Sequence, residues 1–422
     1  MKKKSFAKLF IITLLFFNSF VARGSEKPDS LLLLKQLNSA AIQIAMDSTE
    51  NFEQFSFLDK SIKESRIIGL GEATHGTHDF VKGNTEIIKY LITHKNFKVV
   101  VFESQYGGTD LLNKYIKGED VKLNSAIYNI GFLNLMNYDI LNFAKWLREY
   151  NANKKQEKQV VLYGCDSQSA RYVVDDLMKF LDEHQSLSKE LKEGMIDLRD
   201  NMHKTSHKQM KQTLKLLERS FKSLNANDEI MQRLQIVIQS VDLATSSALG
   251  RILKRDQLMS LNCKWIFNYN HQNKMAIYAH NAHIAKTSDN SMKKPMGQYI
   301  SQLYPDFFVI GTGFNQGTVK VQNMGKNPNQ TYKSAIDNSY DFFFTQCKYP
   351  AFYLDFGLLN NTELKSYVGI KNLSRNIGTG YFIDNAANVQ LNYRKHVLSK
   401  SYDAMLYIKE STPTRLIFTE KL

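Results

Sequence analysis

Short apolar runs alternate with amphipathic segments through the middle of the chain. The runs "RIIGLG", "FKVVVFES", "KQVVLYGCDS", "KMAIYAHNAHIA" and "DFFVIGTGF" are typical of strands that are buried on both faces. Between them, segments such as "DFVKGNTEIIKYLITHK" and "YDILNFAKWLREYN" carry apolar residues at helical spacing. This alternation predicts an α/β fold with a mostly parallel sheet covered by helices.

The pattern changes between about residues 170 and 262. This stretch is long and polar, has no strand signal, and includes "MKQTLKLLERSFKSL" and "EIMQRLQIVIQSVDLA". We interpret it as a large all-helical insertion between the third and fourth core strands, in a position to cap the active face. After Gly317 the runs "VKVQN", "AFYLDF" and "DAMLYIKE" predict further short strands, but their order in the sheet is left open.

The first 24 residues have the pattern of a secretory signal peptide. A basic start, "MKKKSFAK", precedes the apolar run "LFIITLLFF", and "ARG" before Ser25 is a plausible cleavage site. The apolar run is short for a transmembrane span, so an uncleaved anchor is the less favoured alternative. We therefore expect a single domain over residues 25–422, located in the periplasm or secreted, with no stable membrane insertion after cleavage.

Charge and cysteine content narrow the function classes. The formal net charge is +14, but the basic residues are scattered among acidic ones and no aromatic-basic repeat occurs. This favours a solvated basic surface and argues against a nucleic-acid partner. Cys165, Cys263 and Cys347 are widely spaced, so neither a zinc ribbon nor a disulfide framework is indicated. One disulfide and three buried thiols both stay open.

Polar side chains stand at or just after the carboxyl ends of four predicted strands. In an open parallel sheet, ligands bind in the crevice beyond these ends, so the side chains should meet at one edge. The residues are Glu72 and His75 after the first strand, Glu103 at the end of the second, Asp166 at the end of the third, and His280 and His283 after the fourth.

This set suits hydrolysis by activated water. A histidine can take a proton from water near neutral pH, and a neighbouring glutamate can hold and stabilise the imidazole. No GxSxG elbow is present, and Cys165 is expected to be an inert buried thiol rather than a nucleophile. The alternative is a zinc- or manganese-dependent hydrolase, because the same residues include enough nitrogen and oxygen ligands for a metal.

The segment "GLGEATHGTHDF" contains both structural and chemical candidates. We expect Gly69 and Gly71 to let the chain turn off its strand, and Asp79 to cap the helix that follows. Glu72 and His75 are the chemical part of the segment.

Several segments together resemble the erythromycin esterase family. The similar segments are "GEATHGTHDF", "VVVFES", "WLREYN" with "VVLYGCDSQ", "RDQLMSLNCKWI" and "AHNAHI", which keep their order between Arg66 and Ile284. The resemblance implies hydrolysis of a small-molecule ester or lactone by water, with no required metal or other cofactor. The best-known members of the family open the macrolide lactone ring and give antibiotic resistance, whereas many others have no established substrate.

The resemblance also assigns expected roles to residues. The family's general base falls on His75, its assisting glutamates on Glu72 and Glu103, and its second essential histidine on His283. We further expect His280, Asp166 and Arg255 to contact the substrate or, for Arg255, to close the helical cap.

One position departs from the family pattern. The family often carries an arginine in the first helix, where this chain has Asn84, with Lys82 nearby. If that arginine binds substrate, the departure favours a substrate other than a macrolide.

Overall fold

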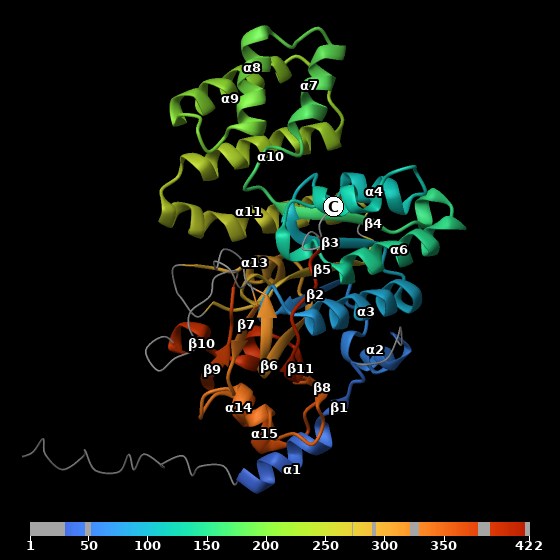
Figure 1. The fold of residues 1–422 in the computed structure, drawn as a ribbon, viewed down its shortest axis with the longest axis vertical. Helices are drawn as coiled ribbons and strands as arrows, with labels where there is room; N and C mark the ends of the chain where they lie inside the picture. The colour runs from blue at the N-terminus through green and yellow to red at the C-terminus, as the bar shows by residue number, and fades with distance from the viewer. Residues whose placement is uncertain are drawn as a thin grey trace, which may run out of the picture.

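The computed structural model describes residues 30–46, 52–271, 273–288, 293–320, 329–378 and 389–417, and its core is one nine-stranded sheet (Figure 1). The strands of this sheet are β1 (Ile42–Gln43), β2 (Ile67–Glu72), β3 (Val99–Gln105), β4 (Val161–Asp166), β5 (Met275–His280), β6 (Phe308–Lys320), β7 (Asn329–Tyr332), β8 (Ala351–Asp355) and β11 (Ala404–Ser411). A separate antiparallel pair consists of β9 (Lys371–Arg375) and β10 (Tyr393–Val397).

The strand order is β1-β8-β11-β6-β2-β5-β3-β4, with β7 paired to β6. The block from β11 to β4 is parallel throughout, whereas β1, β7 and β8 pair antiparallel. The predicted mostly parallel sheet is therefore confirmed. The run "VKVQN" begins within β6, and "AFYLDF" and "DAMLYIKE" correspond to β8 and β11.

Two hydrophobic cores lie on the two faces of the sheet. In β3, Val99 and Val101 belong to one core, and Val100 and Phe102 belong to the other, as the two-residue period of a strand requires. Both faces are apolar because helices cover both. The helices outside the insertion are α1 (Ser30–Ala40), α2 (Leu58–Ile62), α3 (His78–Lys95), α4 (Asp110–Ile116), α5 (Leu123–Asn129), α6 (Tyr138–Ala152), α12 (Asn281–Ile284), α13 (Met296–Leu303), α14 (Tyr340–Phe344), α15 (Thr362–Val368) and α16 (Leu398–Ser401).

The predicted helical insertion lies between β4 and β5 and contains five helices. In Figure 1, α8 and α9 stand farthest from the sheet, and α11 returns to it. Four helices begin at a side-chain cap, supplied by Ser188, Ser206, Asn227 and Ser247, which satisfies a backbone N–H in the first turn. The five are α7 (Val174–Glu183), α8 (Lys189–Asp200), α9 (His207–Phe221), α10 (Asp228–Thr245) and α11 (Ala248–Tyr269).

The insertion ends later than the expected boundary at about residue 262. Helix α11 is continuous to Tyr269 and packs on the sheet through its second half, where the Asn262 amide donates to the Cys165 carbonyl oxygen at 2.9 Å. The sequence signal ended early because this half is apolar on the face that meets the sheet.

The prediction that Gly69 and Gly71 turn the chain off its strand was wrong. Both glycines lie inside β2, and the chain turns after Glu72. Gly71 is instead required by close packing, because a Cβ atom there would lie 2.1 Å from the Asn281 Oδ1 atom. In the turn itself, a Cβ atom at Gly76 would lie 1.6 Å from the Lys320 carbonyl oxygen. Two backbones therefore meet at Gly76.

The predicted capping role of Asp79 was also wrong. Helix α3 has Thr77 at its N-cap, and no side chain caps the helix there. The Asp79 carboxylate instead accepts hydrogen bonds from the Thr412 backbone N–H at 2.6 Å and from the Thr412 hydroxyl at 2.9 Å. Asp79 thus fixes the segment after β11 to the start of α3.

The sequence left the state of the three cysteines open and predicted a signal peptide at the start of the chain. Cys165, Cys263 and Cys347 are buried free thiols. The predicted signal peptide over residues 1–24 lies outside the described residues. Within the described ranges, no helix combines the length and apolar character needed to cross a bilayer.

Candidate active site

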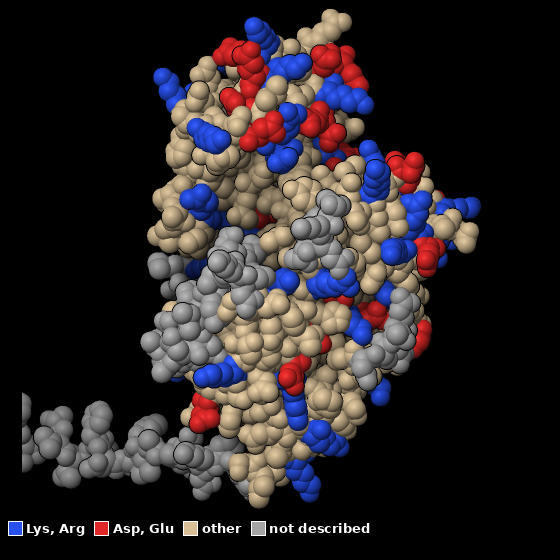
Figure 2. Space-filling view, in the orientation of Figure 1, with Lys and Arg blue, Asp and Glu red and all other residues tan. Residues whose placement is uncertain are grey.

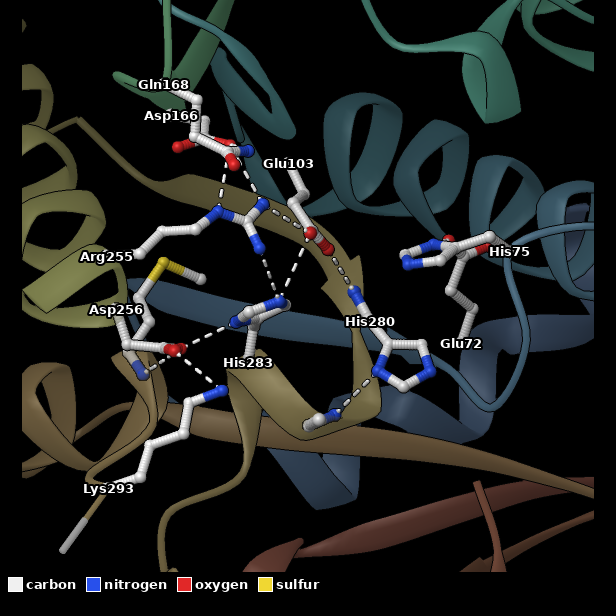
Figure 3. Close-up of polar contacts among 12 residues, drawn as sticks. Glu72, His75, Glu103, Asp166, Gln168, Arg255, Asp256, His280, His283 and Lys293 are labelled. Atoms are coloured by element: carbon white, nitrogen blue, oxygen red, sulfur yellow. Dashed lines mark hydrogen bonds and ion pairs between the residues drawn. The ribbon is translucent and has the colours of Figure 1, made fainter. Parts of the chain in front are cut away.

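The predicted site residues converge at one edge of the sheet (Figure 3). Strands β2, β5, β3 and β4 are neighbours in that order and run parallel, so their carboxyl ends meet. The register pairs Glu72 of β2 directly with His280 of β5. Arg255 approaches the same edge from α11 of the helical insertion.

His75 and Glu72 form a buried pair. The His75 Nδ1 atom lies 2.5 Å from the Glu72 Oε1 atom, and the Tyr278 hydroxyl donates to Glu72 Oε2 at 2.6 Å. Two partners therefore hold the carboxylate, and the carboxylate holds the imidazole. The His75 Nε2 atom has no hydrogen-bond partner among the described residues. A neutral ring with its proton on Nδ1 leaves Nε2 as a proton acceptor.

Glu103 connects three separate segments. Its Oε1 atom accepts from the Arg255 Nη2 atom at 2.9 Å and lies 3.2 Å from the His283 Nε2 atom. Its Oε2 atom accepts from the His280 backbone N–H at 2.9 Å. The Glu103 side chain is 5% exposed. Both carboxylate oxygens are thus occupied by protein donors.

Asp256 is a site residue that the sequence reasoning missed. Its Oδ1 atom lies 2.6 Å from the His283 Nδ1 atom and also accepts from the Met296 backbone N–H at 3.0 Å. Lys293 lies 3.2 Å from the other carboxylate oxygen. Asp256 follows Arg255 directly in "RDQLMSLNCKWI", so its position next to a candidate residue was the available signal.

The charges around His283 keep it protonated. Burial alone would lower the pKa of His283, but the carboxylates of Glu103 and Asp256 outweigh burial and raise it to about 9. Burial would likewise raise the pKa of Glu103, but His283 and Arg255 hold it well below its usual range. The Arg255 Nη1 atom is 3.2 Å from His283 Nε2. Because both groups are cations, we attribute this approach to their shared partner Glu103.

His280 has the opposite character. Burial holds the pKa of His280 well below the usual range of a histidine. Its Nε2 atom lies 3.1 Å from the Ile377 carbonyl oxygen, and its Nδ1 atom accepts from the Ala282 backbone N–H at 3.2 Å. Both nitrogens of the neutral ring are therefore used within the protein. This geometry differs from the expected substrate contact and makes His280 a support for the His75 ring, whose centroid is 4.7 Å away.

Asp166 also contacts protein groups rather than open space. Its Oδ2 atom accepts from the Arg255 Nε and Nη2 atoms at 3.1 and 2.8 Å, and from the Gln168 amide at 2.6 Å. A guanidinium that meets one carboxylate oxygen with two nitrogens is held in orientation. Asp166 and Glu103 together fix Arg255 from two neighbouring strands.

A cavity of about 430 Å³ opens between this cluster and the helical insertion. Arg255, Asp256, His283 and Lys293 line it from the side of the cluster. His75 and Glu72 are not among its lining residues, and His75 is 6% exposed. The cavity therefore reaches Arg255, His283 and Lys293, whereas the buried His75–Glu72 pair lies outside its lining.

Asn84 and Lys82, the positions of the departure from the family pattern, lie away from these contacts. Asn84 is fully buried in α3 and donates to the Gly71 carbonyl oxygen at 2.9 Å. The Lys82 ammonium group donates to the Met46 carbonyl oxygen at 2.6 Å. Neither side chain takes the place of an arginine in the cluster.

Three donors of the metal alternative, Glu103, Asp166 and His283, are engaged in ion pairs within the protein. Arg255 lies between the carboxylates of Glu103 and Asp166, and His283 is bonded through both nitrogens. Within the described part of the chain, no group of three or more His, Cys, Asp or Glu side chains is arranged to hold a metal ion.

The pKa of His283 predicts a pH-dependent stability. The folded protein binds the His283 proton more tightly than the unfolded chain does, because its pKa is about 9 rather than 6.5. We expect the stability advantage of the wild type over H283Q to be complete below pH 6.5 and to decrease as pH rises through about 9. The expected loss is about 3 kcal/mol, measured by urea unfolding of both proteins over this pH range. An advantage that is constant or increases with pH would contradict the assignment.

Comparison with known proteins identifies the family of the chain. The family model "Erythromycin esterase" matches residues 92–411, which include Glu103, Arg255, Asp256 and His283 but not His75. A putative hydrolase of Bacillus subtilis, YbfO, is 20% identical, and the alignment covers 96% of this chain and 97% of that protein. An erythromycin esterase type II of Escherichia coli is also 20% identical, over 87% of this chain and 95% of that protein.

The fold is also found in a solved structure. A protein from Bacillus cereus superposes with a TM-score of 0.80 at 24% identity, covering 92% of this chain and all of the other chain. At this identity the likeness speaks for the fold alone. The family match, by contrast, spans most of the chain and includes β3, β4, β5 and α11, which carry Glu103, Asp166, His280 and Arg255. This α/β protein belongs to the erythromycin esterase family of hydrolases.

Proposed function

We propose that this protein hydrolyses a carboxylic ester or a lactone with water that His75 activates. The observation that carries this proposal is the His75–Glu72 pair. The Nε2 atom of His75 is free in the described structure and lies beside Arg255 and His283, two cations that are ion-paired with Glu103. A base and a positive region are the two elements that ester hydrolysis by water requires. The name of the Escherichia coli relative supports the same reaction class.

In the first step, His75 Nε2 removes a proton from water as the water oxygen attacks the carbonyl carbon. The carbonyl π electrons move to oxygen, and a tetrahedral intermediate forms. Glu72 holds the proton on Nδ1 and stabilises the imidazolium, and Tyr278 keeps Glu72 in place. The pair therefore acts as an oriented base.

In the second step, the intermediate collapses, and the bond between the carbonyl carbon and the alcohol oxygen breaks. The alcohol oxygen receives the proton that His75 took from water, which leaves an acid and an alcohol. The positive charges of His283 and Arg255 stabilise the oxyanion of the intermediate electrostatically. Glu103 and Asp256 are positioning residues, because they hold His283 charged and in place.

The substrate in this proposal is a small molecule that enters beneath the helical insertion, which serves as a cap. Lysine, arginine and acidic side chains are interspersed over the visible face in Figure 2, without a broad positive surface for nucleic acid. A macrolide ring is one candidate, as the name of the Escherichia coli relative suggests. The buried Asn84 leaves other esters equally open.

Replacement of His75 by alanine tests the base. We expect kcat/KM of H75A on a reactive ester, found by screening esters and macrolides, to fall about 10²- to 10⁴-fold, because the base is lost. Initial rates with and without added imidazole are measured, and imidazole should restore part of the activity.

H94A is the matched control for this variant. His94 lies at the other end of α3 and pairs with the exposed Glu53 carboxylate. It should retain wild-type activity. Equal activity of H75A and wild type on the same ester would refute the proposed mechanism.

Chelator treatment separates this mechanism from the metal-dependent alternative. Because Glu103, Asp166 and His283 are already engaged in ion pairs within the protein, we expect activity to survive EDTA followed by desalting. Elemental analysis of the same sample accompanies the rate measurement. Loss of activity that zinc or manganese restores would favour the metal-dependent hydrolase.

We also propose that the chain is exported and cleaved before Ser25, as the basic and apolar pattern of residues 1–24 suggests. In a bacterial host, the exported fraction should contain a protein whose mass and N-terminal sequence begin at Ser25. A full-length protein that fractionates with membranes would instead indicate an uncleaved anchor.

A further inference from the structure

Helix α11 gives the cavity one face with two distinct properties. Ala248, Arg251, Ile252 and Arg255 all line the cavity, and their spacing of three, four and seven residues places them on one side of the helix. Ala248 and Ile252 supply apolar surface, and Leu243 of α10 adds to it. Arg251 and Arg255 supply positive charge.

The two arginines differ in whether a carboxylate forms an ion pair with them. Arg255 is paired with Glu103 and Asp166, and Lys293 across the cavity is paired with Asp256. Arg251 is exposed and forms no ion pair or side-chain hydrogen bond with any residue in the described ranges. It is thus a cation on the cavity wall whose charge no neighbouring carboxylate neutralises.

A second cavity extends this region along the insertion. It has a volume of about 600 Å³ and shares Gln168, Leu243 and Arg251 with the first cavity. Arg171 also lines it. The one carboxylate in its wall, Asp200, is bonded to Arg199. Arg251 therefore stands where the two cavities join, between the paired charges of the cluster on one side and the Arg171 guanidinium on the other.

We propose that the site takes an anionic ester, in which a carboxylate or phosphate group remote from the scissile bond pairs with Arg251. This inference rests on the proposed function and specifies the substrate class for the same site. A guanidinium binds such oxygen anions with two parallel hydrogen bonds. The apolar wall formed by Leu243, Ala248 and Ile252 fits a hydrocarbon segment between the anionic group and the ester.

The helix sets the separation between the two groups. Arg251 precedes Arg255 by four residues, which corresponds to a rise of about 6 Å along α11. Arg255 contacts Glu103 and approaches His283. An ester placed at the cluster would therefore present an anionic group to Arg251 across a chain of a few carbon atoms. A substrate with a cationic amine at that position would be repelled.

Two 4-nitrophenyl esters test this preference. One is the ester of hexanoic acid, and the other is the half-ester of hexanedioic acid, which carries a carboxylate in place of the terminal methyl group. We expect the wild type to cleave the half-ester with a kcat/KM about tenfold higher, and R251E to lose that ratio, mainly through KM. K264E makes the same charge change on an exposed residue of α11 outside both cavities and should keep the wild-type ratio.

A binding measurement tests the role of Arg251 without requiring that the protein hydrolyse an ester. Calorimetry with hexanedioate, hexyl phosphate and hexanediol should show binding of the two anions and none of the diol, with affinity reduced about tenfold or more in R251E. The tighter of the two anions identifies carboxylate or phosphate as the preferred group. Equal binding of the anions to wild type and R251E would overturn the inference. Absence of cleavage of both esters, with anion binding intact, would count against the proposed function alone.

Discussion

The carboxylate of Glu103 is the contact on which the site depends. It accepts hydrogen bonds from α11 through Arg255 and from the His280 backbone at the end of β5, and it is paired with His283 of α12. Without it, Arg255 Nη1 and His283 Nε2 would remain 3.2 Å apart with no shared counter-charge. Two cations at that distance in a partly buried site repel strongly. Glu103 therefore acts with Asp166 to hold α11 against the sheet and with Asp256 to keep His283 protonated.

The three histidines of the site differ in state because their surroundings differ. His283 lies between two carboxylates and stays protonated, whereas His280 faces a carbonyl oxygen and a backbone N–H and is held neutral. His75 has a carboxylate on one nitrogen and leaves the other without a partner in the described structure. The charged and polar groups around each ring thus give three histidines three roles: His283 is a cation, His280 supports a neighbouring ring, and His75 is a base.

Sequence reasoning located the sheet edge but not the contacts within it. Glu72, Glu103, Asp166 and His280 were found because apolar runs mark parallel strands, and parallel strands end together. Asp256 was missed because only the docking of α11 brings it to His283, and its own helical pattern carries no such information. For the same reason Asp79 was misread, since its partner Thr412 is distant in the chain. Gly71 was misread because its close neighbour, Asn281, comes from another strand's end.

Helix α11 contributes one residue to substrate recognition, Arg251, and one to the catalytic cluster, Arg255. Its Arg255 side chain is fixed by Glu103 and Asp166, and its Arg251 side chain lies one turn earlier on the same face. The edge of the sheet is fixed by strand register, whereas the cavity wall is built from helices with their own caps. Residues of the insertion can therefore differ in the cavity wall while the strand register stays the same, and α11 contributes to both the cavity wall and the cluster.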